Sequence, residues 1–154
     1  MKLVIDTNLL VLLVVGRTDR GLIQSHKRTK TFQVEDFDLL VRFIGQFQLT
    51  LVTPHIVTET SNLIVQTFDK MVPLLRATLA ALVQSQDEQY TASVELTDQP
   101  AYPRLGLTDA AILQLVNDGA MLITTDMDLY LEAARMRPEL AMNFNHLRMG
   151  GLLS

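Results

Sequence analysis

Four acidic residues occupy positions that favour a chemical role, namely Asp6, Glu59, Asp109 and Asp126. If the fold brings them together, four like charges crowd one place, and a divalent cation would relieve the repulsion. Mg²⁺ and Mn²⁺ prefer oxygen ligands of this kind. A cation held by carboxylates can activate water, hold a phosphate oxygen and stabilise the leaving oxygen of an in-line displacement. The competing interpretation is a scatter of helix caps, a role that Asp serves well.

Two of these acids, Asp6 and Asp126, follow short apolar runs of the kind expected for buried strands. Residues 3–5 precede Asp6, residues 121–124 lie just before Asp126, and a helical pattern follows each acid. In an open parallel α/β sheet, ligands bind at the carboxyl ends of the strands. We therefore expect both carboxylates at the same edge of one sheet.

The other two acids fall within helical patterns, where they share a stripe with apolar residues. Glu59 lies three residues after Ile56 and four before Leu63, and Asp109 precedes Ile112 by three. Residues at this spacing share one helix face. An unpaired buried carboxylate costs several kcal/mol, so we expect a compensating partner for both acids. For Asp109, a first-turn acid favoured by the helix dipole is the simpler alternative.

Three small polar residues, Thr7, Asn8 and Thr125, flank the acids at the strand ends. Their hydroxyl and amide groups can orient carboxylates or water through hydrogen bonds. Asp128 lies only two residues after Asp126. Its role stays open between an additional group around a metal ion and a solvated acid of the first helical turn.

The chain that positions these residues alternates strand-like runs with helical periodicity. We expect strands at residues 3–5, 49–52, 93–96, 121–124 and 141–147, a first helix ending at Gly16, and helices at residues 34–47, 54–66, 69–86, 109–117 and 129–137. Gly16 is expected to cap the first helix, and Thr53 and Thr108 to begin two later ones. The alternation predicts an α/β fold with a parallel sheet covered on both faces, in one domain over residues 1–154.

The composition is that of a folded, acidic protein. The 154 residues are 48% hydrophobic, carry a net charge of −4 and include no cysteine. A nucleic-acid partner would therefore need a local basic patch or a metal ion to offset the acid. The apolar run at residues 3–15 is too short to span a bilayer, and no signal-peptide cleavage site follows it. We therefore expect a cytoplasmic protein with no membrane partner.

The most basic stretch of the chain covers residues 17–30. Its basic residues are Arg17, Arg20, Lys27, Arg28 and Lys30, against the single acid Asp19. One interpretation is a solvated, mobile connector. The other is a loop that contacts RNA, because Lys and Arg release counterions from a nucleic-acid backbone.

Four short motifs together resemble the PIN-domain ribonuclease family, which includes the VapC-type toxins. They are Val-Ile-Asp-Thr-Asn at residues 4–8, Thr-Pro-His-Ile-Val-Thr-Glu at 53–59, Leu-Thr-Asp-Ala-Ala-Ile at 107–112, and Ile-Thr-Thr-Asp-Met-Asp-Leu at 123–129. They occur in the order found in the family, and the resemblance covers nearly the whole chain. Leu129 stands where the family often has an aromatic residue.

The resemblance implies a three-layer α/β/α sandwich with a central parallel sheet of four to five strands. It implies an Mg²⁺- or Mn²⁺-dependent endoribonuclease for single-stranded or structured RNA, with catalytic roles for Asp6, Glu59, Asp109 and Asp126. Asp6, Asp109 and Asp126 would hold metal, with Glu59 and Asp128 as further candidate ligands and Asn8 and Thr125 in support. It also suggests the toxin of a toxin–antitoxin pair, with an antitoxin protein and a second copy of the chain as partners.

Two other functions compete with this reading. A catalytically inactive PIN-like interaction module is one, with the apolar helix at residues 69–86 as its docking face. A phosphatase with Asp6 as nucleophile is the other, although Asn8 stands where such sites usually have a second Asp. A dinucleotide-binding site is disfavoured because no Gly-x-Gly-x-x-Gly follows the first strand.

Overall fold

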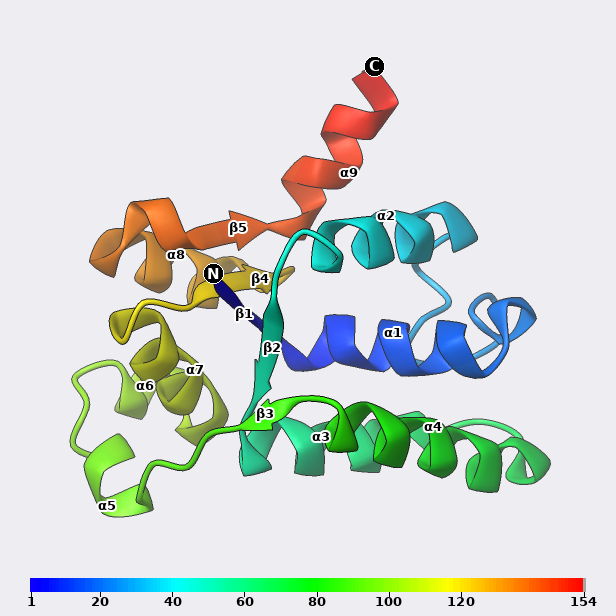
Figure 1. Cartoon of the computed structure of the whole chain (residues 1–154), viewed down its shortest axis with the longest axis horizontal. Helices are drawn as coiled ribbons and strands as arrows, with labels where there is room; N and C mark the ends of the chain where they lie inside the picture. The colour runs from blue at the N-terminus through cyan, green and yellow to red at the C-terminus, as the bar shows by residue number, and fades with distance from the viewer. Residues whose placement is uncertain (154) are drawn as a thin grey trace.

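A five-stranded parallel sheet runs through the middle of the computed structural model, which describes residues 1–153 and the side chains of residues 1–150 (Figure 1). The strands are β1 (Lys2–Ile5), β2 (Leu49–Val52), β3 (Asp87–Glu88), β4 (Met121–Thr124) and β5 (Ala141–Asn143). Their order across the sheet is β3-β2-β1-β4-β5, and every neighbouring pair is parallel. All the strands therefore end at the same edge, with β1 at the centre.

Helices cover both faces of this sheet, which confirms the predicted three-layer α/β/α sandwich. On one face lie α1 (Thr7–Thr18), α2 (Val34–Ile44), α3 (Pro54–Ile64) and α4 (Val72–Gln84); on the other lie α5 (Ser93–Leu96), α6 (Tyr102–Leu105), α7 (Leu107–Asn117) and α8 (Met127–Met136). This division follows from right-handed crossovers, because the chain reverses its direction across the sheet after β3. The last helix, α9 (Phe144–Leu153), follows β5 and extends toward the C-terminus near α2 (Figure 1).

Helix α1 is the centre of the core on its face. Residues Leu9 to Val15 are all at most 1% exposed, because α1 packs against α2, α3 and α4. A helix that is apolar all round is expected in such a fully enclosed position. Asp6 is therefore anchored between a buried strand and a buried helix, which fixes the direction of its side chain.

Gly16 does not end α1, so the prediction of a C-terminal cap there is wrong. The helix continues to Thr18, and a Cβ atom at Gly16 would lie 2.2 Å from Cδ2 of Phe37. The glycine therefore lets α1 and α2 approach closely. Sequence patterns cannot distinguish a glycine at a close helix contact from a glycine that caps a helix, because either one can lie near the end of an apolar run.

The segment between β2 and α7 departs most from expectation. Residues 93–96 form one turn of helix rather than a strand, with Leu96 buried against Ala110 and Ala111. Short apolar runs do not distinguish these two states. Strand β3 was not expected, since it consists of Asp87 and Glu88, residue types that are depleted in strands.

Several boundaries also move. The strand expected at 141–147 ends at Asn143, where α9 begins almost directly, and the 69–86 segment starts with the short 3₁₀ turn η2 (Asp69–Met71). Thr53 caps α3 as predicted, with its side chain accepting a hydrogen bond from the backbone of Ile56. Thr108 does not cap α7, which begins at Leu107, two residues earlier than expected, directly after Gly106. Gly106 has a φ of 90°, a conformation that glycine adopts without steric cost.

The basic stretch, which begins in the last turn of α1, is partly packed against the protein and is therefore not a fully solvated connector. It contains the 3₁₀ turn η1 (Arg20–Leu22) and buries Leu22, Ile23, His26 and Thr29. Its charged side chains remain exposed. The Lys and Arg side chains of this stretch therefore extend into solvent from a backbone that is anchored by buried residues.

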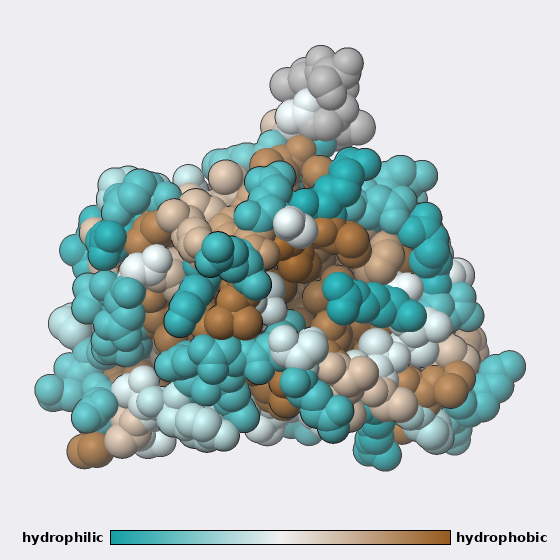
Figure 2. All heavy atoms as spheres, viewed as in Figure 1, coloured by the Kyte–Doolittle hydropathy of each residue, from teal (hydrophilic) through white to brown (hydrophobic). Residues whose placement is uncertain are grey.

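Helix α4 mainly serves the core. Leu75, Leu79 and Leu82 are buried, whereas Leu74 is 54% exposed. On the face in Figure 2, hydrophilic residues are spread between smaller brown areas, including the region over α4 at the lower right. Within residues 1–153, every helix is too short or too polar to cross a lipid bilayer.

Candidate active site

A cleft of about 400 Å³ opens at the edge of the sheet where the strands end. Its lining comes from the residues that follow β1 and β4, from the first turn of α1, from α3, and from the end of α6 and the start of α7: Asp6, Thr7, Asn8, Glu59, Leu63, Leu105, Gly106, Leu107, Thr108, Asp109 and Asp126. All four acids singled out in the sequence thus line one cleft. Because they come from four separate segments, only the tertiary fold brings them together.

Asp6 is the most deeply placed of these acids, with 7% of its surface exposed. It caps α1, since Oδ1 accepts a hydrogen bond of 2.8 Å from the backbone N–H of Thr7. Its Oδ2 accepts a bond of 2.6 Å from Oγ1 of Thr124. Burial raises the pKa of Asp6, the bonds from Thr124 and Thr7 oppose this rise, and the charges of Asp126 and Glu59 add to it.

Thr124 contacts two of these acids and was missed by the sequence analysis. It is fully buried at the end of β4, donates to Asp6, and accepts a 2.9 Å hydrogen bond from the backbone N–H of Asp126. Its hydroxyl therefore connects the two strand-end acids. Thr125, which was expected in this role, lines a neighbouring pocket instead. Adjacent residues at the end of a strand point to opposite sides, and the sequence alone does not show which of these two threonines meets Asp6.

Asp126 caps a helix and still has carboxylate oxygen lone pairs that could bind a metal ion. It is exposed and caps α8, with Oδ1 accepting a 3.1 Å hydrogen bond from the backbone N–H of Leu129. The interpretation as a helix cap is therefore correct for both Asp6 and Asp126, but it does not exclude metal binding, because a carboxylate offers about four lone-pair sites. Asp128 is exposed and is not among the residues that line the cleft.

Glu59 is not buried, contrary to expectation. The buried stripe of α3 consists of Ile56, Thr60 and Ile64, four residues apart. Glu59 and Leu63 lie beside that stripe and face the cleft, where Glu59 is exposed to solvent. The sequence pattern placed Glu59 correctly relative to Leu63 but could not show that this side of the helix meets a cleft rather than the core.

The electrostatics of the cleft strongly perturb the carboxyl group of Asp109. It lies half-buried in the first turn of α7. Burial raises the pKa of its carboxyl group to about 7, with further contributions from the charges of Asp6, Asp126 and Glu59. The charges of Asp6, Asp126 and Glu59 therefore act on Asp109 and disfavour its ionised form. A strongly perturbed acid in a cleft is typical of functional sites.

The donor set suits a hard divalent cation, because all four charged groups offer oxygen ligands. Among the described residues, however, no three acidic or histidine side chains are spaced as ligands of one ion. A complete shell would therefore require side-chain movement, for which the exposed Glu59 and Asp126 have room.

The basic residues predicted to bind RNA do not all lie at one place on the protein. Arg20 forms an exposed ion pair with Asp38, and Arg17 and Lys30 are exposed away from both the cleft and the neighbouring pocket. The remaining two, Lys27 and Arg28, line that neighbouring pocket, which also contains Arg148 from α9.

No protein-family model matches the sequence, and no curated protein matches it. A functional assignment therefore depends on the motifs and on the geometry of the cleft.

Proposed function

We propose that this protein is a metal-dependent endoribonuclease of the PIN-domain type. The observation that carries the proposal is the convergence of Asp6, Glu59, Asp109 and Asp126 on one cleft at the carboxyl edge of a parallel sheet. Ligands bind at this edge in open α/β sheets. Burial raises the pKa values of Asp6 and Asp109, and the neighbouring carboxylates raise them further, so a cation bound in the cleft would favour the ionised form of both acids.

In this proposal, Asp6, Asp109 and Asp126 hold Mg²⁺ or Mn²⁺, and Glu59 at the exposed side completes the ligand set or orients the attacking water. The bound cation would supply Lewis-acid activation of water and charge stabilisation at the phosphate. Thr124 fixes the rotamer of Asp6 and ties it to the start of α8. Hydrolysis would leave a 5′-phosphate and a 3′-hydroxyl.

The substrate class and cellular role rest on the resemblance of the four motifs to PIN-domain ribonucleases and VapC-type toxins. RNA as substrate agrees with an open, polar cleft flanked by basic side chains. A toxin role, an antitoxin partner, a homodimer and a cytoplasmic location belong to the same proposal.

The direct test is cleavage of labelled single-stranded RNA and DNA in the presence of Mn²⁺, Mg²⁺ or EDTA. We expect RNA cleavage that requires metal and is abolished in Asp6→Asn and Asp109→Asn. Asn also caps helices well, so α1 should persist in the first variant, which circular dichroism can verify. Asp98→Asn, at an exposed position outside the cleft, is the matched control and should retain activity.

The opposite results are equally informative. Full cleavage by Asp6→Asn would remove the assignment of the site. If calorimetry detects no Mn²⁺ binding by the wild-type protein, the catalytically inactive interaction module becomes the better description.

A further inference from the structure

A second pocket adjoins the acidic cleft and has the opposite charge. Its lining includes Lys27 and Arg28 from the loop after α1, Asn145 and Arg148 from α9, Asn8 from the first turn of α1, and Thr125, which follows β4. We call it the basic pocket. Asn8 lines both the basic pocket and the acidic cleft, so the two adjoin at the start of α1.

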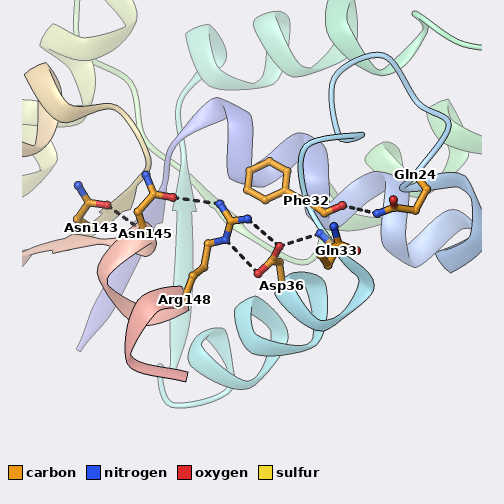
Figure 3. Close-up of polar contacts among 7 residues, drawn as sticks. All are labelled: Gln24, Phe32, Gln33, Asp36, Asn143, Asn145 and Arg148. Atoms are coloured by element: carbon orange, nitrogen blue, oxygen red, sulfur yellow. Dashed lines mark hydrogen bonds and ion pairs between the residues drawn. The ribbon is translucent and has the colours of Figure 1, made fainter. Parts of the chain in front are cut away.

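Hydrogen bonds to Asp36 and Asn145 hold the side chain of Arg148 (Figure 3). Its Nε and Nη2 each donate a 3.0 Å hydrogen bond to Asp36, and Nη1 donates one of 3.2 Å to Oδ1 of Asn145. The guanidinium group also lies over the ring of Phe32, 5.1 Å from its centroid. Three of the five N–H groups of Arg148 are used, which leaves two donors for a ligand.

Lys27 and Arg28 supply the net positive charge, because Arg148 is balanced by Asp36. In the described part of the chain, neither Lys27 nor Arg28 forms an ion pair with a carboxylate. Both side chains are exposed, but their backbone is fixed by a buried residue.

That buried residue is His26, which is fully enclosed and bonded through both ring nitrogens. Nδ1 accepts a 3.0 Å hydrogen bond from the backbone N–H of Arg28, and Nε2 lies 2.9 Å from the carbonyl oxygen of Ile64. Because Nδ1 accepts, Nε2 carries the proton and donates to Ile64. The side chains of Lys27 and Arg28 therefore project from a fixed backbone beside the cleft.

We propose that the basic pocket binds a phosphate group of the same single RNA strand whose neighbouring phosphodiester lies in the acidic cleft. This inference rests on the proposed nuclease function. A protein with net charge −4 and an acidic site repels a polyanion, so binding requires a local cationic contact. A polynucleotide carries a phosphate on every nucleotide, and the shared wall at Asn8 permits one strand to occupy both places.

The test measures binding without cleavage, by fluorescence anisotropy of a labelled single-stranded RNA in EDTA over a range of salt concentrations. The pocket variant is Lys27→Gln with Arg28→Gln. The matched control is Lys70→Gln with Arg76→Gln, which removes the same charge from exposed positions elsewhere. We expect the pocket variant to bind about fivefold or more weakly and its salt slope to fall by about 0.7 per lost phosphate contact. The control should change affinity by less than about twofold.

A second comparison tests whether RNA binding needs the basic pocket itself or only the positive charge of the basic stretch. Arg17→Gln with Lys30→Gln removes two charges from the same basic stretch but outside the pocket. Equal weakening by this variant and by the pocket variant would overturn the proposal, as would unchanged binding by the pocket variant. Stronger competition by poly-glutamate than by unlabelled RNA would also overturn it, because the pocket would then favour an acidic peptide.

The outcome is independent of cleavage. If the wild-type protein cleaves RNA with Mn²⁺ but the pocket variant binds normally, the nuclease proposal stands and the phosphate pocket is rejected. If the pocket variant alone loses RNA binding but no protein cleaves RNA, the pocket is a nucleic-acid site and the nuclease proposal fails.

Discussion

Replacement of Asp109 by Asn should stabilise the metal-free protein above neutral pH. In the folded state the pKa of Asp109 is raised from 3.8 to about 7, chiefly by burial and then by the charges of Asp6, Asp126 and Glu59. Between these two pH values the folded protein retains a proton that the unfolded chain has released. The free energy of unfolding therefore decreases as the pH rises from about 4 to about 7, and the loss persists above that range.

The size of the effect follows from the shift. A rise in pKa of about 3 corresponds to at most about 4 kcal/mol, at 1.36 kcal/mol per pH unit. Asp109 is partly exposed, so water and salt screen the interaction, and we expect about 2 kcal/mol. Asp109→Asn should thus raise the free energy of unfolding by about 2 kcal/mol at about pH 8, and by almost nothing near pH 4.

Urea unfolding in EDTA, followed by circular dichroism at both pH values, measures this difference. Asp98→Asn is the control for loss of one exposed negative charge and should shift stability by less than about 0.5 kcal/mol. Saturating Mn²⁺ should reverse the order, because a ligand that binds at a hundred times its Kd stabilises by about 2.7 kcal/mol and Asp109→Asn has lost a ligand group. A variant that is no more stable than wild type at pH 8 in EDTA would refute the raised pKa of Asp109 in the folded protein.

Three further substitutions probe other parts of the structure. Thr124→Val leaves Asp6 without its hydroxyl donor and should slow RNA cleavage by about 10- to 100-fold, as expected when a group that orients a ligand is lost, whereas Thr124→Ser should retain most activity in the same assay. Gly16→Ala places a methyl group 2.2 Å from the ring of Phe37 and should destabilise the protein by about 1–3 kcal/mol in urea unfolding; unchanged stability would mean that α1 and α2 separate freely. Arg148→Met leaves Asp36 on α2 mostly buried and without its ion-pair partner. The free energy of unfolding should therefore fall by about 1–2 kcal/mol, which is less than for a fully buried pair. Arg148→Lys should recover part of this loss.

Strands β1, β2 and β4 were predictable from the sequence because each is a short apolar run that polar or turn-forming residues terminate. The position of Asp6 and Asp126 at strand ends follows from the same local signal, and so does the cap at Thr53. Where local signals conflict, prediction failed: the β3 strand is built from two acids, and residues 93–96 form a helical turn although their composition suits a strand.

The side-chain partners were not predictable in the same way. Thr124 and Asp6 are 118 residues apart in the sequence, and Arg148 and Asp36 are 112 residues apart. Periodicity reports which face of a helix or strand a residue occupies, but not what that face meets, and this limit explains the wrong expectation of a buried Glu59.

The sequence by itself thus determined the α/β class, the strand-end placement of two carboxylates and the types of group available for chemistry. The tertiary structure alone decided that four acids share one cleft, that Thr124 rather than Thr125 bonds to Asp6, and that Arg148 joins Lys27 and Arg28. The reason is physical: local propensity and hydrophobic periodicity act over a few residues, whereas these groups are brought together by the parallel pairing of β1 with β4 and by the packing of α9 against α2.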